Sequence, residues 1–244
     1  MGVLASIIDK SISGSFSSDV FSVGSSAFQS CGNLTSVSFP NATSIDDGAF
    51  RSCSSLTEVS IPNATSLGNS AFRDCASLTS ASFPKATSIG SSAFQSCGNL
   101  TSVSSPNATT INSNAFYECS SLTSTSFPNV TSIGEYAFYG CRNLTSISFP
   151  NATSISYSAF EYCRSFTSVS FPNATSIGNS AFEYCSNLTD IYVGTSTSTA
   201  CTLGASAFYK CTNLTNIYVP SSLVDSYKSA KNWSSYASKI KAAP

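Results

Sequence analysis

The chain has 244 residues, of which only 9% are charged, and a formal net charge of -1 with no histidine. Its 11 Lys and Arg residues are offset by 12 Asp and Glu residues, which excludes a basic surface for nucleic acid. The apolar runs are far shorter than the ~20 residues of a membrane helix, and the 41% hydrophobic content excludes a charge-rich disordered chain. Because histidine is the commonest general base and metal ligand, its absence leads us to expect no metal site and no cofactor.

Residues 1 to 22 contain apolar side chains but not the motif that fills most of the chain, and we expect them to cap the N-terminal end of the fold. They lack the basic start, the long apolar stretch and the small-residue cleavage site of a secretion signal. Either such a signal was removed, or the protein leaves its cell by another route, or it stays inside.

From residue 23 to residue 220 one motif recurs, at a spacing of 22 residues except for a final step of 26. An Ala-Phe pair is followed by a Cys three residues after the Phe, then by a Leu and a stretch close to TSVSFPNATSIG. The nine Phe residues of the motif are Phe28, Phe50, Phe72, Phe94, Phe116, Phe138, Phe160, Phe182 and Phe208. A unit of this size cannot bury its own apolar face, so the units must stack. The motif predicts a repeat solenoid of about nine 22-residue turns.

Within one unit, Leu34, Val37 and Phe39 have the LxxLxL spacing of a leucine-rich repeat, and Ser36 and Ser38 alternate with them. This alternation predicts a short strand in a parallel sheet, with the Ser side chains outward. A Pro-Asn pair then predicts a turn. The return side has room only for short extended or single-turn pieces, so we expect it to be mostly irregular.

Nine of the ten Cys residues follow the repeat, and the tenth, Cys201, lies in a four-residue insertion within residues 194 to 202. Stacked side chains lie ~5 Å apart and point the same way, whereas the Cβ atoms of a disulfide converge to ~3.8 Å. We therefore expect inert buried thiols at the nine repeat positions. At Cys201 we expect a surface thiol, free or bridged.

The C-terminal segment, residues 221 to 244, does not contain the repeat, and we expect it to form a helical cap. Ser222 and Asp225 have the spacing of a capping box. Leu223, Val224, Tyr227 and Ala230 fall on one helical face. One bent helix or two short helices should cover the edge of the last strand, which would otherwise invite pairing with another chain. The sequence thus divides into an N-terminal capping segment (1–22), a solenoid (23–220) and a C-terminal cap (221–244).

Only one pair of residues raises the question of catalysis. Glu161 and Glu183 occupy the same repeat position in consecutive turns and should lie ~5 Å apart, near the carboxylate separation of a retaining glycosidase. An exposed edge gives no cleft to desolvate one acid, and we expect Arg164 to pair with Glu161 instead. No cleft-forming insertion and no phosphate-binding glycine loop accompanies them, so we expect no enzyme and no catalytic residue.

Variation between the units is concentrated at the two positions after the Phe. The strand positions are nearly uniform Ser and Thr, but these two positions carry Gln, Arg, Tyr, Glu and Lys. All eleven Tyr residues lie from residue 117 onward. We expect Tyr117 to stack on Tyr139, and Tyr162 on Tyr184. The predicted ligand-binding residues are Tyr117, Tyr136, Tyr139, Tyr157, Tyr162 and Tyr184. Tyrosine offers a rigid apolar ring with a hydroxyl group, which suits contact with a protein or a sugar.

The motif AFxxCxxL, followed by a strand, a Pro and an Ile-Gly pair, resembles the BspA-type, or Treponema pallidum-type, leucine-rich repeat over roughly residues 20 to 220. The unit here is 22 residues long, whereas most relatives have 23. The resemblance implies a bacterial surface protein associated with adhesion to host proteins or cells, with some relatives in protist parasites and in prophage genes.

Three functions are compatible with these observations. We favour a noncatalytic binding or adhesion module that recognises a protein or glycan on a cell or particle surface, located outside the cell or on its surface. The alternative is a structural or receptor-binding component of a phage virion or of an extracellular appendage. A third candidate is an ice-binding surface, because flat Thr ladders on solenoids can order water. The oligomeric state and the identity of the ligand stay open.

Overall fold

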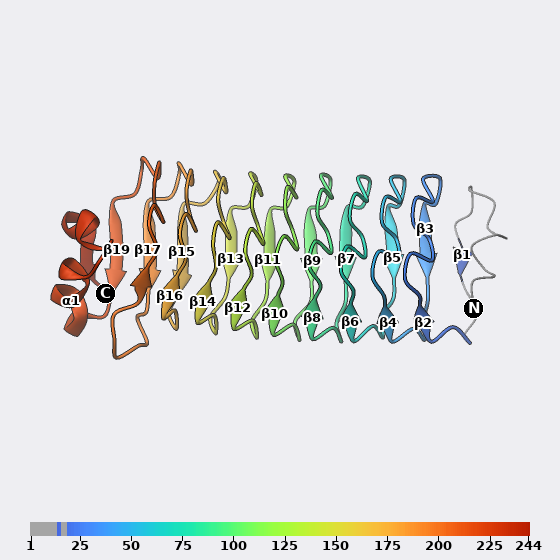
Figure 1. The fold of residues 1–244 in the computed structure, drawn as a ribbon, viewed down its shortest axis with the longest axis horizontal. Coiled ribbons are helices and arrows are strands. Elements are labelled where there is room, and N and C mark those ends of the chain that lie inside the picture. The colour runs from blue at the N-terminus through green and yellow to red at the C-terminus, as the bar shows by residue number, and fades with distance from the viewer. Residues whose placement is uncertain (1–13, 16–18) are drawn as a thin grey trace.

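The computed structural model describes residues 14–15 and 19–244, so most of the predicted N-terminal capping segment lies outside the described residues. The described chain forms a solenoid of about ten turns of roughly 22 residues. The turns stack along one long axis, and the described part of the chain begins at one end of the rod and finishes at the other (Figure 1). The predicted leucine-rich repeat solenoid is confirmed.

One long side of the rod consists of the strands predicted from the LxxLxL spacing. These strands are β1 (Gly14–Ser15), β3 (Ser36–Ser38), β5 (Glu58–Ser60), β7 (Ser80–Ser82), β9 (Ser102–Ser104), β11 (Ser124–Ser126), β13 (Ser146–Ser148), β15 (Ser168–Phe171), β17 (Asp190–Val193) and β19 (Asn216–Val219). All pairings are parallel and in register, as in Val37 opposite Val59. The ladder is interrupted between β5 and β7 and between β13 and β15, so this side comprises three sheets. We call it the strand face.

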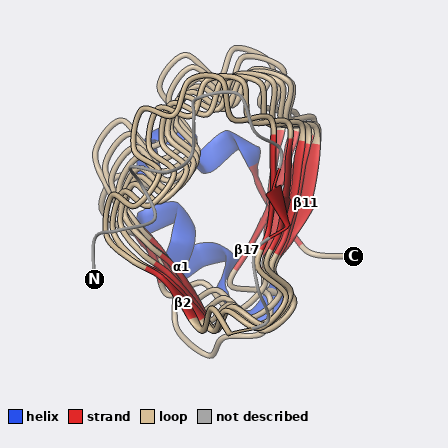
Figure 2. Cartoon of the chain, turned by 90° about the vertical axis from the view of Figure 1, so that its right-hand side faces the viewer, coloured by secondary structure: helices blue, strands red, loops and turns tan. Residues whose placement is uncertain are grey.

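The return side is more regular than the sequence indicates. Its short extended pieces pair into one continuous nine-stranded parallel sheet, seen on the lower left of the end view (Figure 2). The strands are β2 (Ser22–Val23), β4 (Ser44–Ile45), β6 (Ser66–Leu67), β8 (Ser88–Ile89), β10 (Thr110–Ile111), β12 (Ser132–Ile133), β14 (Ser154–Ile155), β16 (Ser176–Ile177) and β18 (Thr202–Leu203). The predicted extended pieces are present, but their pairing into a sheet was not predicted.

Equivalent apolar residues form continuous columns in the core. The rings of Phe28, Phe50 and Phe72 stack with centroids 5.2 Å apart and nearly parallel planes, and this column continues to Phe208. Each buried ring removes apolar area worth about 1.5–3 kcal/mol from water. The repeat therefore stabilises itself only as a stack, because every ring is covered by the two neighbouring turns.

The repeat cysteines are free thiols, and all of them except the half-buried Cys31 are buried. Each buried thiol donates a hydrogen bond to a Phe carbonyl of the preceding turn, as in Cys53 Sγ to Phe28 O at 3.0 Å and Cys75 Sγ to Phe50 O at 3.1 Å. Burial raises the pKa of Cys53 to about 12, with a further contribution from Cys31. The prediction of buried thiols is confirmed at eight of the nine repeat positions, and each of these eight thiols joins two turns.

Two polar residues interrupt the core columns near the middle of the rod. Ser105 is fully buried where neighbouring turns have Phe83 and Phe127, and its hydroxyl donates to the Phe83 carbonyl at 3.2 Å. Thr125 takes the place of the inward residue of β11, and its buried hydroxyl has no hydrogen-bond partner. An unpartnered buried hydroxyl costs about 1–3 kcal/mol of stability, so we expect Thr125 to destabilise the core more than Ser105 does.

The C-terminal segment consists of a 3-10 helix η1 (Ser221–Leu223), a helix α1 (Val224–Ser229), a second 3-10 helix η2 (Ser234–Lys239) and a strand β20 (Ile240–Ala242). The predicted short helices are present, with Tyr227 buried. The predicted capping box of Ser222 and Asp225 is wrong, because α1 begins after Leu223 and neither helix has a side-chain cap. The expectation that the helices cover the last strand edge is also wrong in part: β20 pairs with β19 in parallel, so a strand extends the sheet by one position.

The prediction of a surface thiol at Cys201 is also wrong. This residue is 1% exposed. Its N–H group donates to the Tyr227 hydroxyl at 2.9 Å, and Trp233 Nε1 donates to its carbonyl at 2.6 Å. The insertion folds beneath the C-terminal segment, and burial raises the pKa of Cys201 to about 12.

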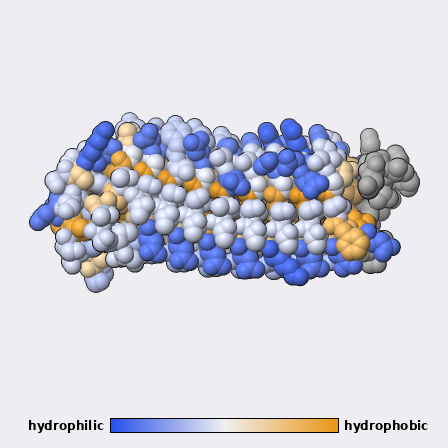
Figure 3. Space-filling model, turned by 60° about the horizontal axis from the view of Figure 1, so that its bottom comes forward, coloured by the Kyte–Doolittle hydropathy of each residue, from blue (hydrophilic) through white to orange (hydrophobic). Residues whose placement is uncertain are grey.

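The outer surface of the solenoid is lined by rows of small polar side chains. Beside the strands on both sides of the rod, Thr hydroxyls donate to Thr carbonyls one turn back, as in Thr57 to Thr35 at 3.0 Å and Thr65 to Thr43 at 3.0 Å. One face of the molecule shows a narrow hydrophobic stripe and parallel pale and hydrophilic stripes that run along the axis (Figure 3). No helix in the described part of the chain is long and apolar enough to cross a bilayer.

Candidate binding surface

The variable edge is formed by a backbone segment that has the same shape in every turn. In one turn of the solenoid, the N–H groups of the alternate residues Tyr136, Phe138 and Gly140 donate hydrogen bonds of 3.0, 2.8 and 2.8 Å to carbonyls of the next turn. The N–H groups of the residues between them donate to carbonyls three residues earlier in the same solenoid turn. Tyr136 and Gly140 have positive φ angles of 56° and 71°. The equivalent residues in all the remaining turns from Ser26 onward also have positive φ angles. Because this backbone recurs every turn, side chains at equal positions stack.

The predicted tyrosine pairs are present. The rings of Tyr117 and Tyr139 stack with centroids 4.7 Å apart and planes 4° apart, and those of Tyr162 and Tyr184 do so at 4.6 Å and 6°. The two stacks occupy different repeat positions. They meet where the rings of Tyr139 and Tyr162 contact each other edge to face, with centroids 5.4 Å apart. The structure therefore joins both predicted columns into one aromatic surface.

Tyr136 and Tyr157 extend this surface sideways. The Tyr136 ring lies 6.5 Å from Tyr117, 5.9 Å from Tyr139 and 5.1 Å from Tyr157, in each case edge to face. Tyr157 is 41% exposed. All six predicted residues thus form one contiguous cluster.

Tyr209 belongs to the same cluster and was not predicted as a site residue. Its ring lies 6.0 Å from Tyr184 at a plane angle of 85°, and it is 49% exposed. It occupies the repeat position of Tyr117 and Tyr139, directly after the motif residue Phe208, which is the signal that identifies it. We call the seven residues Tyr117, Tyr136, Tyr139, Tyr157, Tyr162, Tyr184 and Tyr209 the tyrosine surface.

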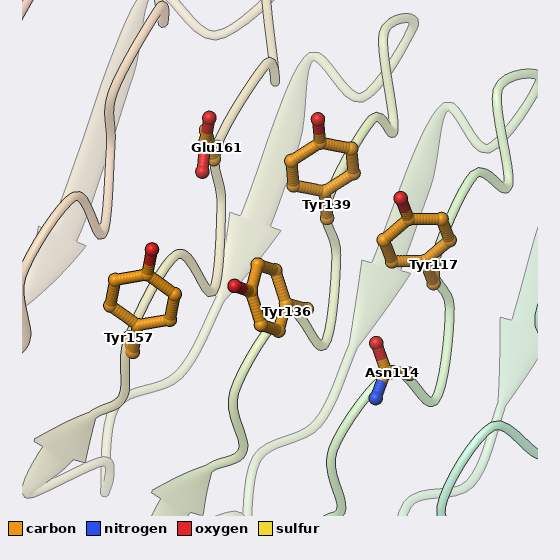
Figure 4. Close-up of a pocket in the computed structure, with 6 residues that line it drawn as sticks. All are labelled: Asn114, Tyr117, Tyr136, Tyr139, Tyr157 and Glu161. Carbon is orange, nitrogen blue, oxygen red and sulfur yellow. The ribbon is translucent and has the colours of Figure 1, made fainter.

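The tyrosine surface contains an open hollow of about 360 Å³. It is lined by Asn114, Tyr117, Tyr136, Tyr139, Tyr157 and Glu161. Tyr117 and Tyr139 lie with the same tilt on one side of the hollow, Tyr136 and Tyr157 lie on the other, and Glu161 closes one end (Figure 4). The hollow offers ring surfaces, phenol hydroxyls, one amide and one carboxylate to a ligand.

Three of the tyrosines occupy backbone positions that disfavour large side chains. Tyr136, Tyr162 and Tyr184 have φ angles of 56°, 61° and 59°, in the left-handed region that costs a residue other than glycine about 1 kcal/mol. Other turns place small residues there, such as Ser30, Ser92 and Gly140, all at positive φ. The fold therefore does not require tyrosine at these positions.

The charges around the hollow are acidic. Burial raises the pKa of Glu161, the neighbouring Ser158 hydroxyl opposes this, and the carboxylate of Glu183 adds to the increase. The predicted pairing of Glu161 with Arg164 is wrong: the Arg164 guanidinium lies 5.4 Å over the ring of Tyr162, and within the described chain no ion pair joins it to Glu161. The ring competes successfully because a guanidinium stacks on an aromatic face.

Two tyrosine hydroxyls of the hollow are also perturbed. Hydrogen bonding with Tyr157, followed by burial, raises the pKa of Tyr136 to about 12. Burial and the carboxylate of Glu161 raise the pKa of Tyr139 to about 12. Both phenols are therefore protonated hydrogen-bond donors at neutral pH.

The repeat and the fold both match known proteins. The profile of the BspA type leucine rich repeat region, with six copies, matches residues 10–123 and 109–236. No protein with a curated description matches the chain.

Two solved structures show the same architecture. A leucine-rich repeat protein from Bacteroides ovatus ATCC 8483 is 28% identical, with a TM-score of 0.72 over 91% of this chain and 57% of that one. The T. pallidum leucine-rich repeat protein is 29% identical, with a TM-score of 0.61 over 65% of this chain and 79% of that one. The chain thus spans little more than half of the length of the B. ovatus protein. Since the repeat profile matches well over half of the residues, the chain belongs to the BspA-type leucine-rich repeat family.

Proposed function

We propose that this protein is a noncatalytic binding module whose contact surface for a partner is the tyrosine surface. The observation that carries the proposal is the placement of Tyr136, Tyr162 and Tyr184 at positive φ, where most other turns have Ser, Gly, Asn or Asp. Large rings at strained and exposed positions add little to folding, whereas rigid aromatic side chains are the commonest anchors of binding surfaces. A BspA-type repeat protein is consistent with a protein-binding or adhesion module.

The hollow supports binding better than catalysis. Its only carboxylate is Glu161, which is half-buried on an open surface, and solenoids of this family are typically noncatalytic. An acid or base catalyst needs a partner group and exclusion of water, and an open edge excludes little water. BspA-type proteins are typically associated with the cell surface, and we propose the same location for this one.

The proposal is tested by returning the tyrosine surface to the residues of other turns. The variant combines Tyr139→Gln, Tyr162→Ser and Tyr184→Ser, because Gln95, Ser30 and Ser52 occupy the equivalent positions. Binding partners are first identified on protein and glycan arrays with the parent protein. We expect the variant to bind them at least about tenfold more weakly, the loss of roughly 1.4 kcal/mol that one or two anchor residues supply.

The matched control changes the same edge in the first turns, with Arg51→Gln, Arg73→Gln and Gln95→Ser. We expect this control to bind like the parent, and both variants to keep the parent melting temperature. Equal binding by the tyrosine variant and the parent would place the contact elsewhere, on the strand face above all.

A further inference from the structure

Carboxylates are concentrated around the tyrosine surface. The chain has five glutamates, and four of them, Glu118, Glu135, Glu161 and Glu183, lie in the turns that carry the tyrosines. Glu161 lines the hollow. The Glu118 carboxylate packs over Gly140, where a Cβ atom would lie only 3.0 Å from Glu118 Cδ. Gly140 therefore leaves room for an acidic group on the surface.

The carboxylates affect the pKa of two tyrosine hydroxyls in the hollow. Glu161 and Glu118 both contribute to the raised pKa of Tyr139, and Glu161 and Glu135 contribute to that of Tyr136. Such coupling requires the negative charges to lie close to the hollow. The hollow thus combines aromatic rings with nearby carboxylates.

The same surface already binds two of the chain's own cations. Arg164 lies 5.4 Å from the centroid of the Tyr162 ring, and Lys210 Nζ lies 5.4 Å from the centroid of the Tyr209 ring. A cation over a tyrosine face gains about 0.5–1 kcal/mol at an exposed site and more where it is desolvated. Within the described residues, no Lys or Arg lies over the rings of Tyr117, Tyr136, Tyr139 or Tyr157. The rings that line the hollow therefore have no cation stacked on them within the described residues.

We propose that the hollow binds a lysine or arginine side chain from a basic segment of a partner protein. The alkyl part of the side chain packs against the rings of Tyr117 and Tyr139, and the charged group approaches Glu161, as Arg164 and Lys210 approach their rings one and three turns away. A neutral sugar could donate hydrogen bonds to the carboxylates but would gain no charge attraction from them, and an acidic glycan would be repelled. This assignment of ligand chemistry rests on the proposed binding function of the tyrosine surface.

The test uses peptides of defined charge and the whole protein. A fluorescein-labelled Gly-Ser peptide with three lysines is compared with the same peptide carrying acetyllysine, which keeps the side-chain length but removes the charge, and with one carrying arginine. We expect the lysine and arginine peptides to bind at least about fivefold more tightly than the acetyllysine peptide, as measured by fluorescence anisotropy. Binding should weaken as NaCl is raised from about 50 mM to about 500 mM.

Charge variants then locate the contact. The double variant Glu118→Gln and Glu161→Gln should bind the lysine peptide at least about fivefold more weakly than the parent. The matched control, Glu58→Gln with Asp225→Asn, removes the same net charge from exposed sites on β5 and α1 and should bind like the parent. Unchanged melting temperatures exclude unfolding as the cause of a loss.

The outcomes separate this inference from the proposed function. Equal binding of the lysine and acetyllysine peptides, or equal weakening by the two charge variants, overturns the inference. If array partners lose affinity with the tyrosine variant but not with the Glu118→Gln and Glu161→Gln variant, the tyrosine surface binds and its ligand is not cationic. A neutral glycan partner whose binding does not depend on salt has the same meaning.

Discussion

The exposed edge of the solenoid has two halves with one backbone and different side chains. The N-terminal edge presents Gln29, Arg51, Arg73 and Gln95 at the position after the Phe, whereas the tyrosine surface presents Tyr117, Tyr139 and Tyr209 there. Both halves have the same pair of positive φ angles in each turn and the same N–H bonds to the next turn. Since the side chains differ while the backbone does not, the edge residues are not what holds the turns together.

The Phe and Cys columns of the core are the same beneath the two halves. The Phe column and the Cys column run without interruption under the N-terminal edge and under the tyrosine surface. The comparison therefore separates stability from recognition: inward positions hold the stack, and outward edge positions are free to vary. Three measurements can break or sharpen this separation.

The largest expected effect is alkaline unfolding of the whole rod. Burial keeps the folded-state pKa of the thiols above the unfolded value, with Cys53 and Cys211 at about 12 and Cys97 well above its usual range. The stability from protonated thiols is complete below about pH 8.5 and is lost as pH rises toward 12, at about 1.4 kcal/mol per pH unit for each thiol.

Urea unfolding at increasing pH, with a reducing agent present, measures this loss. Because the thiols lie under both halves, we expect both to unfold together and before Tyr136 and Tyr139 ionise. Alkaline stability unchanged up to about pH 11 would show that the thiols do not titrate on unfolding as described.

The second measurement compares one core ring under each half. Phe50→Ala lies under the N-terminal edge and Phe138→Ala under the tyrosine surface, and both rings are fully buried. We expect each variant to lose about 3–5 kcal/mol of unfolding free energy, because the cavity is lined by equivalent neighbours. A clearly larger loss for Phe138→Ala would mean that the tyrosine surface also contributes to stability, and the separation would fail.

The smallest expected effect on the unfolding free energy comes from a substitution that removes a difference between the two halves. Thr125 stands where Val37 and Val59 stand in earlier turns, and its buried hydroxyl has no partner. Thr125→Val should raise the unfolding free energy by about 1 kcal/mol. Thr123→Val is the control: this exposed hydroxyl donates to the Thr101 carbonyl at 3.2 Å, so its loss should not stabilise the protein. Equal effects of the two changes would contradict the assignment of the cost to the buried hydroxyl.

Much of the candidate site could be predicted from the repeat. A spacing of 22 residues places Tyr117 beside Tyr139, and Tyr162 beside Tyr184, whatever the detailed path of the backbone. The contact between the two stacks, from Tyr139 to Tyr162, joins different repeat positions and required the positive φ turn to be known. The hollow could not be predicted for the same reason, nor could the contact of Arg164 with the ring of Tyr162 instead of the carboxylate of Glu161.

The segments outside the repeat were predicted least well. The helical capping box at Ser222 is not formed, β20 rather than a helix pairs with β19, and Cys201 is buried beneath Trp233. None of these contacts recurs, so no second copy in the sequence reveals which residues face one another.

The sequence by itself determined the period, the inward and outward positions, the parallel strand face, the buried thiol column and the residues that stack at equal positions. It could do so because translation by one turn brings each residue next to its own copy, so a contact between turns is already a pattern in the chain. Only the tertiary structure decided the nine-stranded sheet on the return side, the hollow with its carboxylate, and the way the last residues close the stack. These features depend on contacts between residues at different repeat positions or outside the repeat, and such contacts are set by how side chains fill space in three dimensions.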